Sequence, residues 1–143
     1  GGTLDFPSIS AFNVALELLK KEENDEYNRV NEIRNYLISE LKNIPGVVIH
    51  GFKSCCPYIL NISLVDKKAS VVVEGLSNKD IFVNSESACY SKCDAKSYVL
   101  EAIGCDDKEA SNPIRISLGR TNTIDEAHIF VKEFKEILDS IRS

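Results

Sequence analysis

The stretch Tyr58-Ile59-Leu60-Asn61-Ile62-Ser63-Leu64 decides the fold that we predict from this sequence. Apolar side chains occupy every second position from Tyr58 to Leu64, and the polar Asn61 and Ser63 stand between them. This period of two is typical of a strand that packs one face on a core. The short β-branched run Val47-Val48-Ile49-His50 precedes it, and a turn-like sequence joins the two. We therefore expect the two segments to pair as antiparallel strands.

Further segments of the middle and end of the chain extend this prediction. Ile114–Leu118 alternates again and predicts another strand, and Ile81–Val83 predicts a short one. Lys68–Leu76 is ambiguous, because its valines favour a strand whereas its position between two better strands favours a helix. We expect a helix there. Ala95–Ile103 predicts a short helix that ends at Gly104, since glycine suits a helix C-terminus.

The periodicity of apolar residues predicts longer helices at both ends of the chain. One runs from Pro7 to Lys21, and a second covers residues 30–44 and stops at Pro45-Gly46, with the polar break 22–25 between them. The last begins at Thr123-Ile124-Asp125-Glu126, the pattern of a capping box. Together the elements predict an α+β fold, in which helices pack on a small, mostly antiparallel sheet.

Composition and charge limit the function classes. The chain has 143 residues and 43% hydrophobic content, which supports one core and predicts a single domain over residues 1–143. Its 22 acidic and 17 basic residues leave a net charge of −5, which disfavours binding to nucleic acid or to anionic lipid. The sequence shows neither a membrane-length apolar run nor a signal peptide. We expect a cytoplasmic protein without nucleic-acid or membrane partners.

The chain has five cysteines, an odd number, and the cytosol keeps thiols reduced. A disulfide framework therefore does not explain these cysteines well. The stretch Ser85-Glu86-Ser87-Ala88-Cys89-Tyr90-Ser91-Lys92-Cys93 is polar and aperiodic, and predicts a loop in which Cys89 is accessible as a nucleophile. The alternative is that Cys89 is a small buried hydrophobe. Lys92 favours the thiolate and Glu86 opposes it, so the sequence leaves both interpretations open.

The other candidate ligands have simpler explanations. Adjacent Cys55-Cys56 with Cys89 and Cys93 match the spacing of zinc knuckles poorly, and we predict no metal site. Cys105 follows a predicted helix end and is most simply a packing residue. His50 ends a short strand and His128 lies on or near the surface of the last helix, so neither indicates a site.

Arg115 is the most informative charged residue. If Ile114, Ile116 and Leu118 face the core, Arg115 and its neighbour Ser117 project from the other face of the same strand. A guanidinium fixed on a strand can bind a carboxylate through two hydrogen bonds. A surface salt bridge is the alternative. Arg120 is a similar case with less to distinguish it.

Four motifs in the right order resemble the cysteine desulfurases of the iron–sulfur assembly type, which belong to the class-V aminotransferase-like enzymes that use pyridoxal phosphate. The family patterns are S-G-T-x-x-x-x-x-I, L-N-I-S, V-S-S-G-S-A-C and I-R-F-S-L-G-R. In this chain they are matched by Gly2-Thr3 with Phe6-Pro7-Ser8-Ile9, by Leu60-Asn61-Ile62-Ser63, by Val83–Cys89 and by Ile114–Arg120. The resemblance covers nearly the whole chain.

The resemblance implies a specific chemistry and specific residues. L-cysteine is held on pyridoxal phosphate, an enzyme cysteine attacks its sulfur, alanine leaves, and the enzyme retains a persulfide. Carried over by motif, Cys89 is the nucleophile, Arg115 binds the substrate carboxylate, and Thr3 contacts the cofactor phosphate across a homodimer. The persulfide then passes to a sulfur-acceptor scaffold or carrier protein for iron–sulfur cluster assembly.

The resemblance also implies that the chain is incomplete. It matches the C-terminal small domain of the family's transferase fold, and the preceding part carries the lysine and most cofactor contacts. We therefore expect residues 1–143 alone to be inactive and to bind no pyridoxal phosphate. The loop departs from the family, because Glu86 replaces a glycine and Tyr90-Ser91-Lys92 replaces Thr-Ser-Gly. This departure keeps open the alternative of a non-catalytic thiol-bearing interaction module. A further alternative keeps the enzyme but changes its substrate, as in a selenocysteine lyase.

Overall fold

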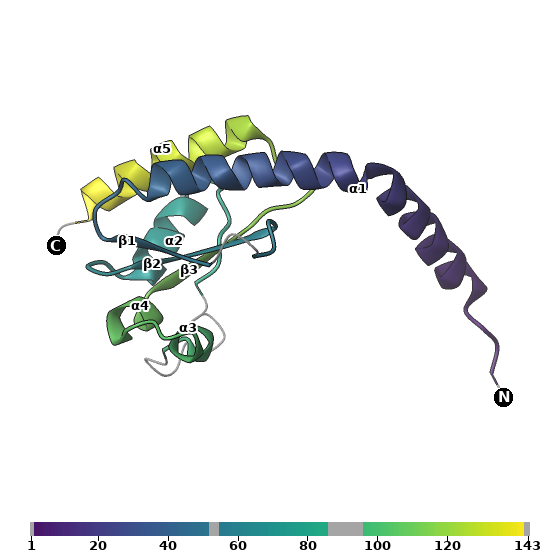
Figure 1. The fold of residues 1–143 in the computed structure, drawn as a ribbon, viewed down its shortest axis with the longest axis horizontal. Helices are drawn as coiled ribbons and strands as arrows, with labels where there is room; N and C mark the ends of the chain where they lie inside the picture. The colour runs from purple at the N-terminus through teal and green to yellow at the C-terminus, as the bar shows by residue number, and fades with distance from the viewer. Residues whose placement is uncertain (1, 52–54, 86–95, 142–143) are drawn as a thin grey trace.

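The computed structural model describes residues 2–51, 55–85 and 96–141 (Figure 1). Cys89, Glu86 and Lys92, which the sequence singles out, lie outside the described residues. None of the helices in the described ranges is long and apolar enough to cross a membrane. In chain order the elements are α1 (Phe6–Leu41), β1 (Val47–His50), β2 (Ile59–Leu64), α2 (Ala69–Ser77), α3 (Tyr98–Ala102), α4 (Asp107–Ser111), β3 (Pro113–Ser117) and α5 (Ile124–Ser140).

The three strands form one antiparallel sheet in the order β1-β2-β3. This confirms the α+β prediction and the pairing of the first two strands. In the register of the sheet, Ile62 of β2 lies between Ile49 of β1 and Ile114 of β3. Asn61 lies between His50 and Arg115. Apolar and polar side chains therefore occupy opposite faces of the same sheet.

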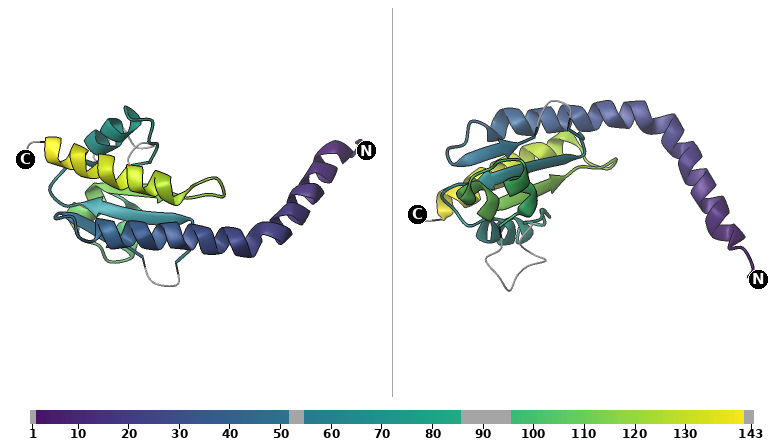
Figure 2. Two further views of the ribbon diagram at one scale, coloured as in Figure 1. Left: turned by 90° about the horizontal axis from the view of Figure 1, so that it is seen from above. Right: turned by 60° about the horizontal axis from the view of Figure 1, so that its bottom comes forward.

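Helices cover both faces of the sheet, as Figures 1 and 2 show. On the apolar face, α1, α2 and α5 pack against the strands around Phe134, Leu37 and Leu76, which are completely or almost completely buried. On the polar face, the short helix α4 lies against β2 and α3 packs on α4, both beneath the sheet in Figure 1. The polar side chains of β2 therefore lie at the interface between the sheet and α4.

The prediction of a strand at Ile81–Val83 is wrong. Residues 81–83 form no strand, and the isolated bridge in this region is made by the next residue, Asn84, with Arg115. The Ile81 N–H donates instead to the Leu76 carbonyl at 3.0 Å, which holds the start of the segment to the end of α2. The apolar composition reflects packing, because Ile81 and Val83 contact the core without forming a strand.

The predicted break at residues 22–25 is also wrong, because α1 runs without interruption from Phe6 to Leu41. Glutamate and lysine are good helix formers, and neither glycine nor proline interrupts the helix after its first turn. Only the second half of α1 lies on the sheet, and its first buried residue is Val30. The first half forms the long arm that leaves the body of the molecule in Figure 1.

The shorter helices agree with the sequence in part. The expected helix at Lys68–Leu76 is confirmed as α2. The helix predicted over Ala95–Ile103 is observed as α3, is shorter, and is followed by Gly104 at φ +89°. The prediction missed α4, which is five residues long and begins where Asp106 accepts hydrogen bonds from two backbone N–H groups. The capping box that starts α5 is present as predicted.

Candidate functional site

Arg115 projects from the polar face of the sheet, as the alternation of β3 predicted. Its neighbours Ile114 and Ile116 are buried in the core, whereas Arg115 is half-buried on the opposite face. Its backbone is held on both sides. It pairs with Asn61 of β2, and it exchanges two hydrogen bonds with Asn84, of 2.7 Å and 3.1 Å. Because the backbone of Arg115 is fixed, its guanidinium is well placed to bind a carboxylate through two hydrogen bonds.

The Arg115–Asn84 bridge also marks one end of the stretch that contains Cys89. Ser85, the next residue, is buried, and the described chain stops there. The chain is described again from Lys96, and the Ser97 N–H donates to the Ala110 carbonyl at 2.7 Å. Ser97 is also buried and caps α3 through its side chain. One flank is therefore held at the β3 edge of the sheet through Asn84, and the other on α4 through Ser97.

Thr3 lies far from Arg115 within this chain. It is exposed just before α1, at the outer end of the arm, whereas Arg115 lies in the sheet (Figure 1). The structure therefore does not bring together the two residues that the resemblance assigns to cofactor and substrate. A second chain that places its own Thr3 near Arg115 is compatible with this separation.

The described residues fit a contributing role in a pyridoxal phosphate site and do not form a complete one. A threonine hydroxyl suits a phosphate and an arginine suits a carboxylate. A complete site also needs the lysine that bonds the cofactor. Several of the described lysines are instead bonded at other places in the fold. Lys67 donates to the Ile141 carbonyl at 2.6 Å, Lys96 pairs with Asp107 at 2.7 Å, and Lys135 pairs with Glu40 at 2.9 Å.

Arg120, the second arginine that the sequence singled out, has a structural partner. Its guanidinium pairs with Glu22 of α1 at 2.8 Å. Arg29 of α1 donates in turn to the carbonyls of Arg120 and Asn122. The turn after β3 is thereby fastened to α1. The contact with Glu22 therefore gives Arg120 a structural role in this turn. It does not place Arg120 beside Arg115.

A hollow in the described parts of the chain does not include Arg115 in its lining. It opens between the start of α5 and the segment Ile81–Val83, and it is lined largely by apolar side chains such as Phe82 and Ile129. Ser117 and Leu118 at the end of β3 complete it. Its apolar lining offers little to a phosphate or a carboxylate, so we do not assign the cofactor to it.

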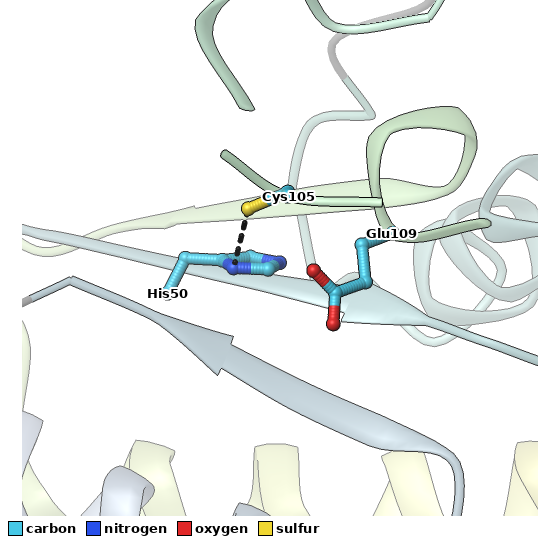
Figure 3. A group of neighbouring side chains, drawn as sticks. All are labelled: His50, Cys105 and Glu109. Atoms are coloured by element: carbon cyan, nitrogen blue, oxygen red, sulfur yellow. Dashed lines mark hydrogen bonds between the residues drawn. The ribbon is translucent and has the colours of Figure 1, made fainter. Parts of the chain in front are cut away.

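The histidines and the remaining cysteines differ in their surroundings. His128 is exposed, as predicted, and its ring meets that of Tyr36 edge to face with centroids 4.6 Å apart. Cys55, Cys56 and Cys105 are free thiols. His50 and Cys105, for which the sequence indicated no site, lie in hydrogen-bond contact (Figure 3). Burial and the neighbouring Glu109 carboxylate raise the pKa of the Cys105 thiol.

Comparison with known proteins places this geometry in a family. The chain matches the family Aminotransferase class-V over residues 1–130. It belongs to that family. This class-V aminotransferase chain is 36% identical over 142 residues to "Cysteine desulfurase IscS" of Proteus mirabilis, covering 99% of the chain and 35% of the relative. It is 32% identical to "Cysteine desulfurase, mitosomal" of Encephalitozoon cuniculi, covering 99% of the chain and 32% of the relative.

Solved structures agree with this assignment. The chain superposes on the NifS-like protein from Rickettsia africae with a TM-score of 0.81 and 28% identity, covering 97% of this chain and 36% of that one. A second NifS-like protein gives a TM-score of 0.83 and 29% identity, covering 99% and 36%. These comparisons confirm the resemblance that the sequence motifs indicated. The class-V aminotransferase chain spans about a third of the length of the relatives that it matches.

Proposed function

We propose that this chain is the C-terminal part of a pyridoxal phosphate-dependent cysteine desulfurase, with Cys89 as the sulfur-accepting residue. The observation that carries the proposal is the double hydrogen bond between Arg115 and Asn84. It places the proposed substrate-binding arginine beside the start of the stretch that contains Cys89. The described start of this stretch and Arg115 thus lie side by side on the sheet, although Asn84 and Arg115 are 31 positions apart in the sequence.

In this proposal Arg115 binds and orients the carboxylate of L-cysteine. Half-burial on the sheet lowers the local dielectric constant and strengthens a charge-assisted hydrogen bond. The two backbone hydrogen bonds to Asn84, and the strand pairing opposite Asn61, fix the origin of the side chain, so that less freedom is lost when substrate binds. The substrate sulfur is then held toward the Cys89 stretch rather than toward the apolar core.

Cys89 performs the sulfur transfer. Its thiolate attacks the substrate sulfur, a sulfur–sulfur bond forms, and the carbon–sulfur bond breaks with its electron pair left on carbon. Protonation of that carbon yields L-alanine, and Cys89 retains a persulfide. Pyridoxal phosphate, when bound, supplies the electron sink that this bond cleavage requires. Cys89 lies four positions after the anchored Ser85, a length of chain that spans at most about 14 Å.

The arm of α1 supports the view that the chain acts within a larger protein. Its apolar side chains are exposed, with Phe6 at 73% and Phe12 at 66%. The same half of α1 also exposes Ile9, Val14, Leu16, Leu18 and Leu19. So many exposed apolar side chains on one helix mark a contact surface. We assign this surface to the preceding cofactor-binding part and to the second chain of a homodimer, where Thr3 contacts the cofactor phosphate.

The remaining assignments follow from the same proposal. The onward partner is a sulfur-acceptor scaffold or carrier protein in iron–sulfur cluster assembly, and the chain alone is inactive. The proposed location is the cytoplasm, on the strength of the net charge and of the bacterial relatives. The mitosomal relative from Encephalitozoon cuniculi makes an organelle the alternative location.

Persulfide mapping tests the proposed role of Cys89. The full-length protein is incubated with pyridoxal phosphate and L-cysteine, alkylated, digested and analysed by mass spectrometry. We expect the peptide with Cys89 to carry one additional sulfur atom, because its thiol is the acceptor. The matched control within the same chain is the exposed thiol of Cys56. Equal labelling of both thiols, or labelling without pyridoxal phosphate, would contradict the proposal.

A further inference from the structure

A cluster of three potential metal ligands lies on the polar face of the sheet, apart from Arg115. His50 comes from the end of β1, Cys105 from the connection between α3 and α4, and Glu109 from α4 (Figure 3). One ligand atom from each residue lies within 4.8 Å of the other two, and all three residues are half-buried. The three residues are separated by up to 59 positions in the sequence, so only the fold brings them together.

The hydrogen bonds around His50 assign the tautomer of its ring. The Ser63 hydroxyl donates its single hydrogen to the Glu109 carbonyl at 2.6 Å. The same hydroxyl oxygen lies 2.7 Å from Nε2 of His50, so Nε2 must be the donor in that contact. The hydrogen of the neutral ring is therefore on Nε2, and Nδ1 carries none. Metal-binding histidines typically have one nitrogen fixed in this way by a neighbouring acceptor.

The nitrogen without a hydrogen is the one beside the thiol. Nδ1 of His50 lies 3.4 Å from Sγ of Cys105. In a tetrahedral zinc site, bond lengths of about 2.3 Å to sulfur and about 2.0–2.1 Å to nitrogen separate these two atoms by about 3.6 Å. The observed spacing matches one edge of such a tetrahedron. To close on a shared ion, the most distant atoms of the cluster need to approach by only about 1 Å.

We propose that His50, Cys105 and Glu109 form a zinc site with the fourth position open to water. A thiolate and a carboxylate together offset the charge of Zn²⁺, and the imidazole ligand is neutral, so the loaded site has no net charge. Neutrality favours burial of the ion between the sheet and α4. The mixed nitrogen, sulfur and oxygen ligands suit zinc better than Ca²⁺ or Mg²⁺, which prefer oxygen alone.

An open fourth position is typical of catalytic zinc, but the location of this site, away from Arg115, indicates a structural role. The ion ties the end of β1 to α4 and to the connection that follows α3. The helix α3 begins at the flank of the Cys89 stretch, where Ser97 bonds Ala110. Zinc bound here therefore fixes the segment that receives this stretch, without entering the sulfur chemistry. This inference departs from the sequence-based prediction of no metal site, and it does not depend on the proposed desulfurase activity.

Metal titration of the full-length protein tests this inference. The protein is stripped of metal and titrated with Zn²⁺ against a chromophoric chelator, and with Co²⁺ to detect absorption from a cobalt–thiolate bond. We expect one site per chain that Cys105→Ser weakens by at least about 100-fold. Ser63→Ala removes the hydroxyl that orients His50 and that also bonds the Glu109 carbonyl, and should weaken binding by about 10–100-fold. The matched control Cys56→Ser should bind zinc as the wild type does.

A second variant separates loss of the site from loss of the fold. Glu109→Gln keeps the size of a half-buried side chain on α4 and removes only its charge, so the protein should fold while its zinc affinity falls. Circular dichroism of the metal-free variants checks the fold. Absence of zinc uptake by the wild-type protein would overturn the inference. Unchanged affinity in both Cys105→Ser and Glu109→Gln would also overturn it, because the zinc would then be bound by other thiols.

Discussion

The full-length protein with Cys89→Ser should form neither alanine nor sulfide from L-cysteine, while the visible absorbance of its pyridoxal phosphate stays unchanged. A serine hydroxyl is a much weaker nucleophile than a thiolate and cannot hold a persulfide. The cofactor contacts proposed for the protein do not involve Cys89, so its absorbance should not respond. Steady-state assays of both products, with a reductant to release the persulfide, provide the measurement.

The control for this variant is Cys56→Ser, which removes an exposed thiol from another part of the chain. It should retain wild-type turnover. Undiminished alanine formation by Cys89→Ser would refute the assignment of the nucleophile. Loss of activity in both variants would show that thiol content in general, and not Cys89, limits the reaction, and would equally contradict the account.

Arg115→Ala should raise the Michaelis constant for L-cysteine by about 10- to 150-fold. The loss of a two-pronged, charge-assisted hydrogen bond to a carboxylate costs about 1.5–3 kcal/mol, and each 1.4 kcal/mol is a factor of about ten. The sheet should tolerate the change, because Arg115 is bonded to Asn84 through its backbone and its place in β3 does not depend on its side chain. Initial rates over a range of cysteine concentrations give the constant.

Two further arginine variants show whether the effect is specific. Arg115→Lys keeps the charge but loses the planar fork, so its Michaelis constant should lie between those of Arg115→Ala and the wild type. Arg120→Ala removes a side chain that pairs with Glu22 on the surface, and should leave the constant near its wild-type value. An unchanged Michaelis constant in Arg115→Ala would show that Arg115 is an ordinary surface residue that does not bind the substrate carboxylate.

The sheet could be predicted because its signal is local. The period of two in β2 and β3 is readable from consecutive residues, and the same alternation places Arg115 opposite the core. The prediction failed at Ile81–Val83, where an apolar composition arises from packing against the core rather than from strand pairing. It also failed at residues 22–25, where charged residues that favour helix were interpreted as a break in α1.

The zinc cluster could not be predicted because its signal is not local. Cys105 and Glu109 are only four positions apart, but no spacing in the sequence relates them to His50 on β1. Their contact depends on α4, which is only five residues long and was missed. The partner of Arg120 was unpredictable for the same reason, since Glu22 approaches it only because α1 is continuous. Sequence motifs identified the residues to which the family assigns a chemical role. The contacts of residues from distant parts of the chain became visible only in the fold.

The most direct test of the central claim is the formation of alanine and sulfide from L-cysteine by the full-length protein with pyridoxal phosphate, measured beside the chain of residues 1–143. The account predicts equal amounts of both products from the full-length protein and none from the shorter chain. Absence of alanine and sulfide from both proteins would contradict a desulfurase and favour a non-catalytic module that presents a thiol. Turnover by the shorter chain would contradict the claim that the cofactor is held by another part of the protein.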